Sequence, residues 1–138
     1  MADDPRITVT EIAGRRRASS GARFEPAVGY SRAVRSGPFI TVSGTVGLEA
    51  DGSYPATIGA QARRALAVIR AASAALGGRM EDVVRTRMFV TDIAAFDEVG
   101  RAHGEVFRDI RPATSMVEVS KLVDGALVEI EADAIVSD

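Results

Sequence analysis

The sequence contains no cysteine and only one histidine, His103, among its 138 residues. Without cysteine the chain cannot form disulfides, carry a thiolate nucleophile or ligate zinc through sulfur. A single histidine cannot supply a histidine cluster for a metal ion either. The composition therefore predicts a protein without a metal site.

Long apolar runs and an excess of one charge are also missing. No apolar run approaches the ~20 residues that a membrane-spanning helix needs, and the start Met-Ala-Asp-Asp-Pro lacks the pattern of a secretory signal. The net charge of −2 creates no overall field toward nucleic acid or an anionic membrane. The triplet Arg15-Arg16-Arg17 has no interleaved aromatics and is more typical of a solvated edge. We therefore expect a cytoplasmic protein whose partners include neither nucleic acid nor a membrane.

The order of strand and helix patterns predicts the fold class. Residues 1–27 read as an N-terminal arm, and residues 28–138 read as one domain with the pattern ββαβαββ. Strands are expected at 30–34, 39–46, 83–90, 114–120 and 127–136. Helices are expected at 56–76 and from the N-cap Asp92 to Phe107. These elements predict an α+β fold, a mixed β-sheet with two helices packed on one face.

Strand residues alternate between the two faces of a sheet, so each expected strand divides into two sets. One set is mostly apolar and suits the side covered by helices: Ile40, Val42, Ser115, Val117, Val119, Val128, Ile130, Ala132 and Ala134. The other set mixes apolar, hydroxyl and charged side chains: Phe39, Thr41, Ser43, Thr45, Arg85, Arg87, Phe89, Thr114, Met116, Glu118, Glu129 and Glu131. Because both expected helices belong on the first face, the second face must meet water or another subunit. Its apolar members favour a subunit contact, in which Glu118 and Glu131 would pair with arginines between subunits.

Several segments resemble the RidA/YjgF family. They are Gly29-Tyr30-Ser31-Arg32-Ala33-Val34, Ile40-Thr41-Val42-Ser43-Gly44, Asp82-Val83-Val84-Arg85-Thr86, Phe89-Val90-Thr91-Asp92, Arg111-Pro112-Ala113-Thr114-Ser115-Met116-Val117-Glu118-Val119 and Val128-Glu129-Ile130-Glu131-Ala132. The resemblance implies a chorismate-mutase-like homotrimer with small-molecule clefts between its subunits. It also implies hydrolysis of enamines and imines, such as 2-aminoacrylate, to 2-keto acids and ammonia without a cofactor.

The resemblance also assigns roles to individual residues. Tyr30, Ser43 and Gly44 fall at substrate-binding positions of the family, and Glu129 falls at the carboxylate associated with the catalytic water. Three positions depart from the family pattern. Thr114 stands where the deaminases have an arginine that clamps the substrate carboxylate, Met116 replaces a frequent cysteine, and Gly100 replaces an asparagine.

The missing arginine leaves more than one function open. One hydroxyl cannot supply the charged bidentate contact of an arginine, so another cation, Arg87, is expected to bind the substrate beside Thr114 and Met116. One hypothesis is an enzyme acting on C=N bonds; the alternative is a trimer that binds a small carboxylic acid without turnover. Endoribonuclease activity is the third and least favoured. His103 lies on the apolar stripe of the second helix and is interpreted as a packed side chain rather than a general base.

Overall fold

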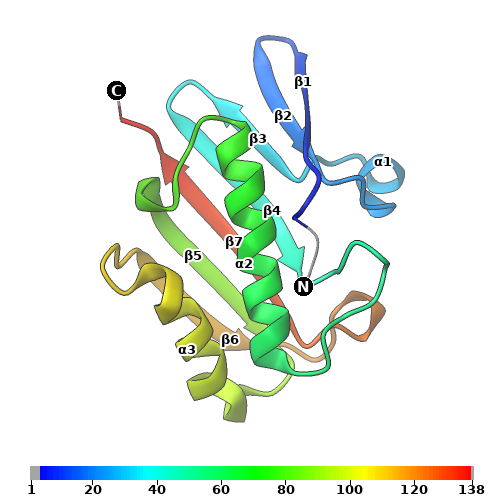
Figure 1. Cartoon of the computed structure of the whole chain (residues 1–138), viewed down its shortest axis with the longest axis vertical. Coiled ribbons are helices and arrows are strands. Elements are labelled where there is room, and N and C mark those ends of the chain that lie inside the picture. Colours follow the sequence, from blue (N-terminus) through cyan, green and yellow to red (C-terminus); the bar gives the residue numbers. More distant parts are fainter. Residues whose placement is uncertain (1–3, 138) are drawn as a thin grey trace.

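The computed structural model describes residues 4–137 and contains a seven-stranded mixed sheet in the order β1-β2-β3-β4-β7-β5-β6 (Figure 1). Among the described strands, β5 and β6 run parallel and every other neighbouring pair is antiparallel. The strands are β1 (Thr8–Ile12), β2 (Arg15–Ser19), β3 (Ala33–Ser36), β4 (Phe39–Val46), β5 (Val83–Val90), β6 (Ala113–Glu118) and β7 (Val128–Ile135). The predicted α+β class is confirmed.

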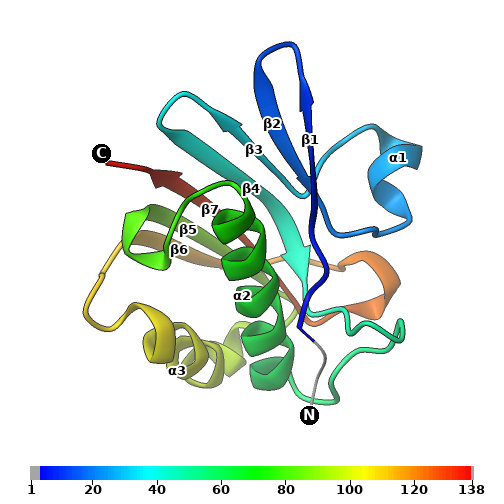
Figure 2. The same ribbon diagram turned by 45° about the horizontal axis from the view of Figure 1, so that its top comes forward.

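Two long helices, α2 (Ile58–Ala75) and α3 (Phe96–Phe107), cover one face of the sheet (Figure 2). The side chain of Thr57 caps α2 by accepting a hydrogen bond from the backbone of Ala60. Gly77, with a φ of 85°, follows the end of α2, where a left-handed residue suits glycine. The described residues also contain three short 3₁₀ segments: η1 (Met80–Asp82), η2 (Ile93–Ala95) and η3 (Val123–Gly125).

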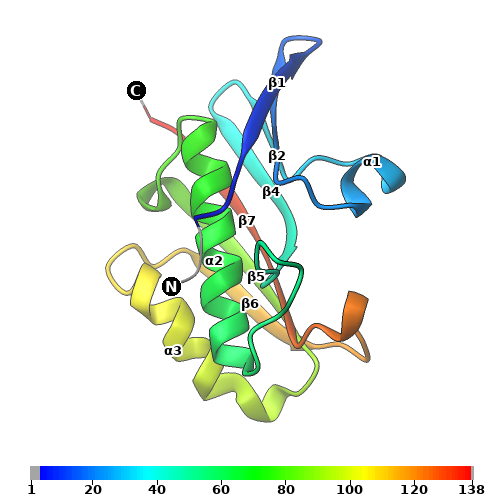
Figure 3. The same ribbon diagram turned by 45° about the vertical axis from the view of Figure 1, so that its right-hand side comes forward.

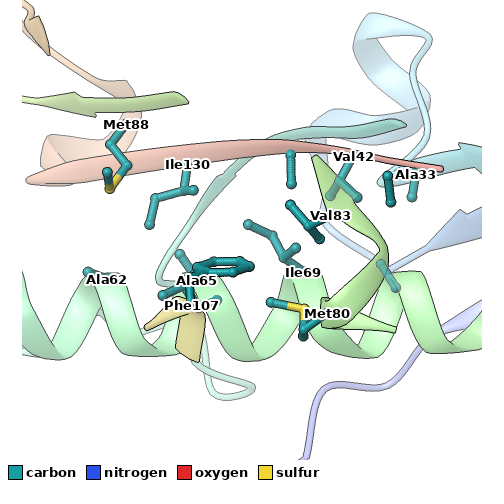
Figure 4. Close-up of a cluster of buried hydrophobic side chains, with 14 of the residues drawn as sticks. Ala33, Val42, Ala62, Ala65, Ile69, Met80, Val83, Met88, Phe107 and Ile130 are labelled. Atoms are coloured by element: carbon teal, nitrogen blue, oxygen red, sulfur yellow. The ribbon is translucent and has the colours of Figure 1, made fainter. Parts of the chain in front are cut away.

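The hydrophobic core lies between these helices and the sheet (Figure 4). Ile69 and Ala65 of α2 face Ile130 of β7, and all three side chains are fully buried. Phe107, at the end of α3, closes the same cluster. Burial of such apolar side chains against one sheet face holds both helices in place.

The segment predicted as an arm extends the sheet and adds a helix. Strands β1 and β2 form a hairpin that pairs with β3, and Ala18 in β2 is fully buried. The short helix α1 (Phe24–Val28) lies on the other side of the sheet from α2 (Figure 3). The sequence predicted two helices, so α1 is an addition, and it is found on the sheet face that was expected to lack helices. The boundary between arm and domain at residue 27 stays a prediction.

Two parts of the predicted face assignment are wrong. A bulge between Val42 and Thr45 shifts the alternation of β4, so Thr45 is buried on the helix side. In β6, Thr114 pairs with Thr86 and Met116 with Met88, both of which are buried under the helices. Cross-strand neighbours point to the same face, so the helix side holds Thr114, Met116 and Glu118, and the open side holds Ser115 and Val117. Alternation alone does not show which residues of an edge strand point to which face of the sheet. The pairing with the neighbouring strand shows it.

Candidate functional site

Four of the predicted site residues gather where β3, β4 and β7 meet. Tyr30 precedes β3, Ser43 and Gly44 form the bulge of β4, and Glu129 lies near the start of β7. The Ser43 hydroxyl donates to the carbonyl of Ser31 over 2.7 Å, which ties the bulge to the segment after Tyr30. The structure thus brings these four residues together, and their roles stay predictions.

The carboxylate of Glu129 lies directly against the backbone of Gly44. A Cβ atom placed on Gly44 would lie 2.8 Å from both Cδ and Oε2 of Glu129, closer than real side chains approach. Gly44 is not in the left-handed region, so the glycine is required here for space rather than for backbone conformation. The bulge and the absent side chain together fix where the carboxylate sits.

Glu129 is half-buried, and its environment favours the protonated form. Burial raises the pKa of the Glu129 carboxyl above its ordinary value, and the charge of Glu131 raises it further. The guanidinium of Arg32 acts in the opposite direction and lowers this pKa. The result is a carboxyl group whose pKa has moved toward neutral pH, as acid–base catalysis requires.

Sequence reasoning missed the buried arginine at the centre of this neighbourhood. Arg32 is 5% exposed, and its Nη1 donates to the carbonyl of Gly44 over 2.8 Å and to Oγ1 of Thr45 over 3.1 Å. Its Nη2 donates to the hydroxyl of Tyr30 over 3.1 Å. Arg32 thereby orients Tyr30 and holds the backbone that faces Glu129.

Glu25 balances the charge of Arg32. The Glu25 carboxylate is 3% exposed, lies 3.5 Å from Nε of Arg32 and accepts a hydrogen bond from the Ser19 hydroxyl. Glu25 belongs to α1, inside the segment interpreted as an arm. The only sequence signal was a pair of opposite charges seven residues apart around Tyr30, which without the fold does not predict a buried pair.

The remaining predicted residues do not join this group within one chain. Thr114 and Met116 lie on β6 at the sheet edge, separated from β7 by β5, and their side chains point to the helix side. Thr114 accepts a hydrogen bond over 2.7 Å from Thr86, whose hydroxyl lies 2.9 Å from Nε2 of His103. His103 stacks on Phe107 at 4.5 Å between ring centroids, consistent with a packed side chain. Burial lowers the pKa of His103, which keeps the ring neutral at neutral pH.

Arg87, the predicted substitute cation, is on the open face with carboxylate partners in its own chain. Its Nη1 lies 2.9 Å from Glu131 and 3.5 Å from Asp133. Within the single chain Glu131 pairs with Arg87, and Glu118 accepts a hydrogen bond from the backbone of Ile93. Both contacts form within one chain, because β5 lies beside β7 and the start of η2 lies beside Glu118 at the end of β6. The pairing of Glu118 and Glu131 between subunits stays a prediction.

A cavity of about 360 Å³ opens beside Tyr30, between the β1–β2 hairpin and α1.

Within residues 4–137 no cluster of three or more histidine, cysteine or acidic side chains is arranged to hold a metal ion. No helix in that part of the chain is long and apolar enough to cross a membrane. The site is thus built from a carboxylate, a tyrosine, a buried arginine and backbone groups.

Comparison with known proteins places these features in a family. Residues 20–136 match the family model described as Endoribonuclease L-PSP. This chain belongs to the RidA/YjgF family. The match covers all the strands of this RidA/YjgF fold except β1 and β2.

Similar proteins agree with this membership. The crystal structure of Rv2704 from Mycobacterium tuberculosis, a member of the YjgF/YER057c/UK114 family, has 52% sequence identity and a TM-score of 0.82, over 88% of this chain and 99% of that one. The 2-iminobutanoate/2-iminopropanoate deaminase of Escherichia coli (strain K12) is 35% identical over 110 residues, 77% of this chain and 86% of the relative. An uncharacterised protein of Streptomyces coelicolor, SCO2049, is 35% identical over 121 residues, 86% of this chain and 90% of the relative.

Proposed function

We propose that this RidA/YjgF family member hydrolyses small imino acids, or the enamines that form them, to 2-keto acids and ammonia. The observation that carries the proposal is the half-buried Glu129 carboxyl, with its raised pKa, held against the backbone of Gly44. A similar protein from Escherichia coli is named as a deaminase of 2-iminobutanoate and 2-iminopropanoate. The substrates proposed for this chain belong to the same chemical class, the small 2-imino acids.

The reaction needs proton transfer and a positioned water but no electron acceptor. The water oxygen forms a bond to the electrophilic imine carbon while Glu129 accepts a proton from that water. Glu129 then returns this proton to the nitrogen, which gives a tetrahedral carbinolamine. It next accepts the proton of the new hydroxyl group and delivers it to the nitrogen, so the C–N bond breaks, the C=O bond of the 2-keto acid forms and ammonia leaves. A carboxyl group performs both transfers best when its pKa lies near the working pH, and burial moves Glu129 in that direction.

Tyr30 is oriented to donate a hydrogen bond to the ligand. Its phenolic oxygen already accepts a hydrogen bond from Arg32, so the hydroxyl hydrogen remains available for another acceptor. Tyr30 also lines the cavity beside α1. A carbonyl or carboxylate oxygen of a small ligand would be a suitable acceptor there.

The clefts are proposed to form between copies of a homotrimer. The open sheet face exposes apolar side chains beside charged ones: Phe39 is 58% exposed, Val117 47% and Ile135 41%. Such a surface is typical of a subunit contact. Thr114 and Met116 lie at the sheet edge, away from Glu129 in the same chain, and an assembly that packs one edge against another copy would bring both groups to one cleft.

One observation favours the alternative of a binding protein without turnover. Position 114 carries a threonine whose hydroxyl is hydrogen-bonded to Thr86, and it offers no positive charge to a carboxylate. A ligand would then be held in the cleft without the clamp that the resemblance implies for deaminases. Turnover decides between the two functions.

The deciding experiment measures the release of ammonia and pyruvate from 2-iminopropanoate generated in situ from alanine by an amino-acid oxidase. We expect the protein to accelerate release above the spontaneous rate, and Glu129→Gln to abolish the acceleration. Glu118→Gln is the matched control, since Glu118 contacts only the backbone of Ile93 among its described partners, and it should retain activity. No acceleration by the unmodified protein from this imine, or from 2-iminobutanoate, would overturn the enzymatic proposal in favour of binding.

A further inference from the structure

The cavity beside Tyr30 has a wall of mixed charge that the sequence interpretation did not anticipate. Its volume of about 360 Å³ is in the range of small-ligand sites. The charged groups that line it are Arg17 from β2, and Arg23 and Glu25 from the segment around α1. What the cavity can bind depends on which of these charges are already paired.

Two of the three charges have partners. The Glu25 carboxylate is buried, accepts from Ser19 and Ser20 and lies beside Arg32. Arg23 pairs with Asp124 over 3.0 Å and is largely exposed to solvent. Neither group is available to a ligand without losing an existing contact.

Arg17 is the remaining charge. It is half-buried, and within residues 4–137 it makes no side-chain hydrogen bond or ion pair. A half-buried guanidinium without a counter-ion in the wall of a cavity favours an anionic ligand. Burial removes part of its hydration, and a bound anion would provide the hydrogen bonds and the opposite charge that water supplies only in part.

The direction of Arg17 follows from the strand alternation. Its neighbour Arg16 donates to the carbonyl of Leu76 at the end of α2, so Arg16 points to the helix side. Arg17 therefore points to the open side of the sheet, the side on which α1 lies (Figure 3). Tyr30 lines the same cavity, which places a cation and a hydroxyl donor around one small space.

We propose that Arg17 binds the carboxylate of a small 2-keto or 2-imino acid in this cavity and supplies the positive charge that Thr114 lacks. The proposal rests on the proposed function for the ligand class. The guanidinium matches a carboxylate in a bidentate geometry, and the Tyr30 hydroxyl donates to the oxygen at the other end of the ligand. The N-terminal hairpin is then part of the binding site.

The test is calorimetric titration of the full chain with pyruvate and with its uncharged analogue pyruvamide. Arg17→Met keeps the length of the side chain and removes its charge. Arg15→Met is the matched control, because Arg15 lies on the same strand and the same face but is exposed and outside the cavity wall. We expect Arg17→Met to weaken pyruvate binding by about tenfold or more, with pyruvamide binding unchanged. Arg15→Met should bind pyruvate like the unmodified protein.

Equal pyruvate affinity in Arg17→Met and the unmodified protein would overturn the proposal, as would the absence of any pyruvate binding. An equal loss in Arg15→Met would show a general effect of charge and would also overturn it. Failure of the proposed hydrolysis is separate. If 2-iminopropanoate is not turned over but pyruvate binding depends on Arg17, the binding site stands and the enzymatic function fails.

Discussion

Arg32 donates a hydrogen bond to the hydroxyl of Tyr30 over 3.1 Å, and its guanidinium lies 5.3 Å from the centre of the tyrosine ring. The same guanidinium holds the backbone of Gly44. One buried side chain thus connects the tyrosine of the site to the strand bulge that faces Glu129. The stability of the fold and the geometry of the site depend on the same residue.

Replacing Arg32 by methionine should destabilise the fold strongly. The substitution leaves the buried carboxylate of Glu25 without its cationic neighbour, and breaking a buried pair in this way costs about 3 kcal/mol or more. Urea unfolding followed by circular dichroism measures the change. Arg63→Met, which removes an exposed pair with Glu105 on the helical side, is the control and should have little effect. A similarly small effect of Arg32→Met would contradict the buried network.

Gly44→Ala should reduce activity without unfolding the protein. The new methyl group would occupy the place of the Glu129 carboxylate, and the flexible glutamate side chain can move away. A displacement of this kind is expected to lower kcat/KM by about tenfold to a hundredfold. Gly104→Ala is the matched control, since a Cβ there meets nothing within 4 Å. Unchanged kcat/KM in Gly44→Ala would show that the position of the carboxylate does not matter.

His103 should contribute to the pH dependence of stability rather than to catalysis. Burial lowers its pKa below the ordinary value of 6.5, so the unfolded chain binds a proton more readily than the folded chain just below that pH. Stability that is present above pH 6.5 is therefore lost as the pH falls through the lowered pKa of the folded state. In His103→Gln this part of the loss should disappear.

The measurement compares urea unfolding of both proteins at about pH 7.5 and about pH 5, on either side of the usual histidine pKa. The free energy of unfolding changes with pH in both proteins, and the difference between these two changes isolates the contribution of His103 from that of the carboxylates, which titrate in both. Activity at neutral pH should stay within about twofold in His103→Gln, a change of less than ~0.5 kcal/mol in the barrier. A large loss of kcat with unchanged stability would instead assign the histidine a role in the reaction.

Thr114→Arg should raise activity toward 2-iminopropanoate. A guanidinium at this position would add a charge-assisted contact to the substrate carboxylate, and we expect an increase in kcat/KM of about tenfold. Thr114→Gln is the control, because it lengthens the side chain at the same position without adding a charge. If both variants, or neither, change kcat/KM, a charge at position 114 does not contact the substrate carboxylate.

Phe39→Glu should disrupt the proposed trimer. Phe39 lies on the open sheet face and is 58% exposed in the single chain, so a charge there would have to be buried at the subunit contact. Light scattering after size-exclusion chromatography should give about three times the chain mass of 14.5 kDa for the unmodified protein and a lower mass for the variant. Phe96→Glu is the control on the helical side, where Phe96 is 55% exposed, and should keep the assembly. A monomeric mass for the unmodified protein would refute the trimer.

The sequence by itself determined the main elements of this protein and most of the neighbourhood around Glu129. The helical stripes of α2 and α3 and the alternation of β7 are local patterns, which can be recognised without knowledge of the fold. Tyr30, Ser43, Gly44 and Glu129 could be selected because their segments resemble a family. The two faces of β7, and the mixed-polarity face of β5, followed from alternation alone.

Only the tertiary structure decided which face β6 presents, because the phase of an edge strand depends on its pairing with β5. The bulge that buries Thr45 likewise has no local signal in the sequence. The pairing of Arg32 with Glu25 and the direction of Arg17 required the fold of the N-terminal hairpin and α1. Buried charges are recognised by the partners that surround them, and those partners meet only when the chain has folded.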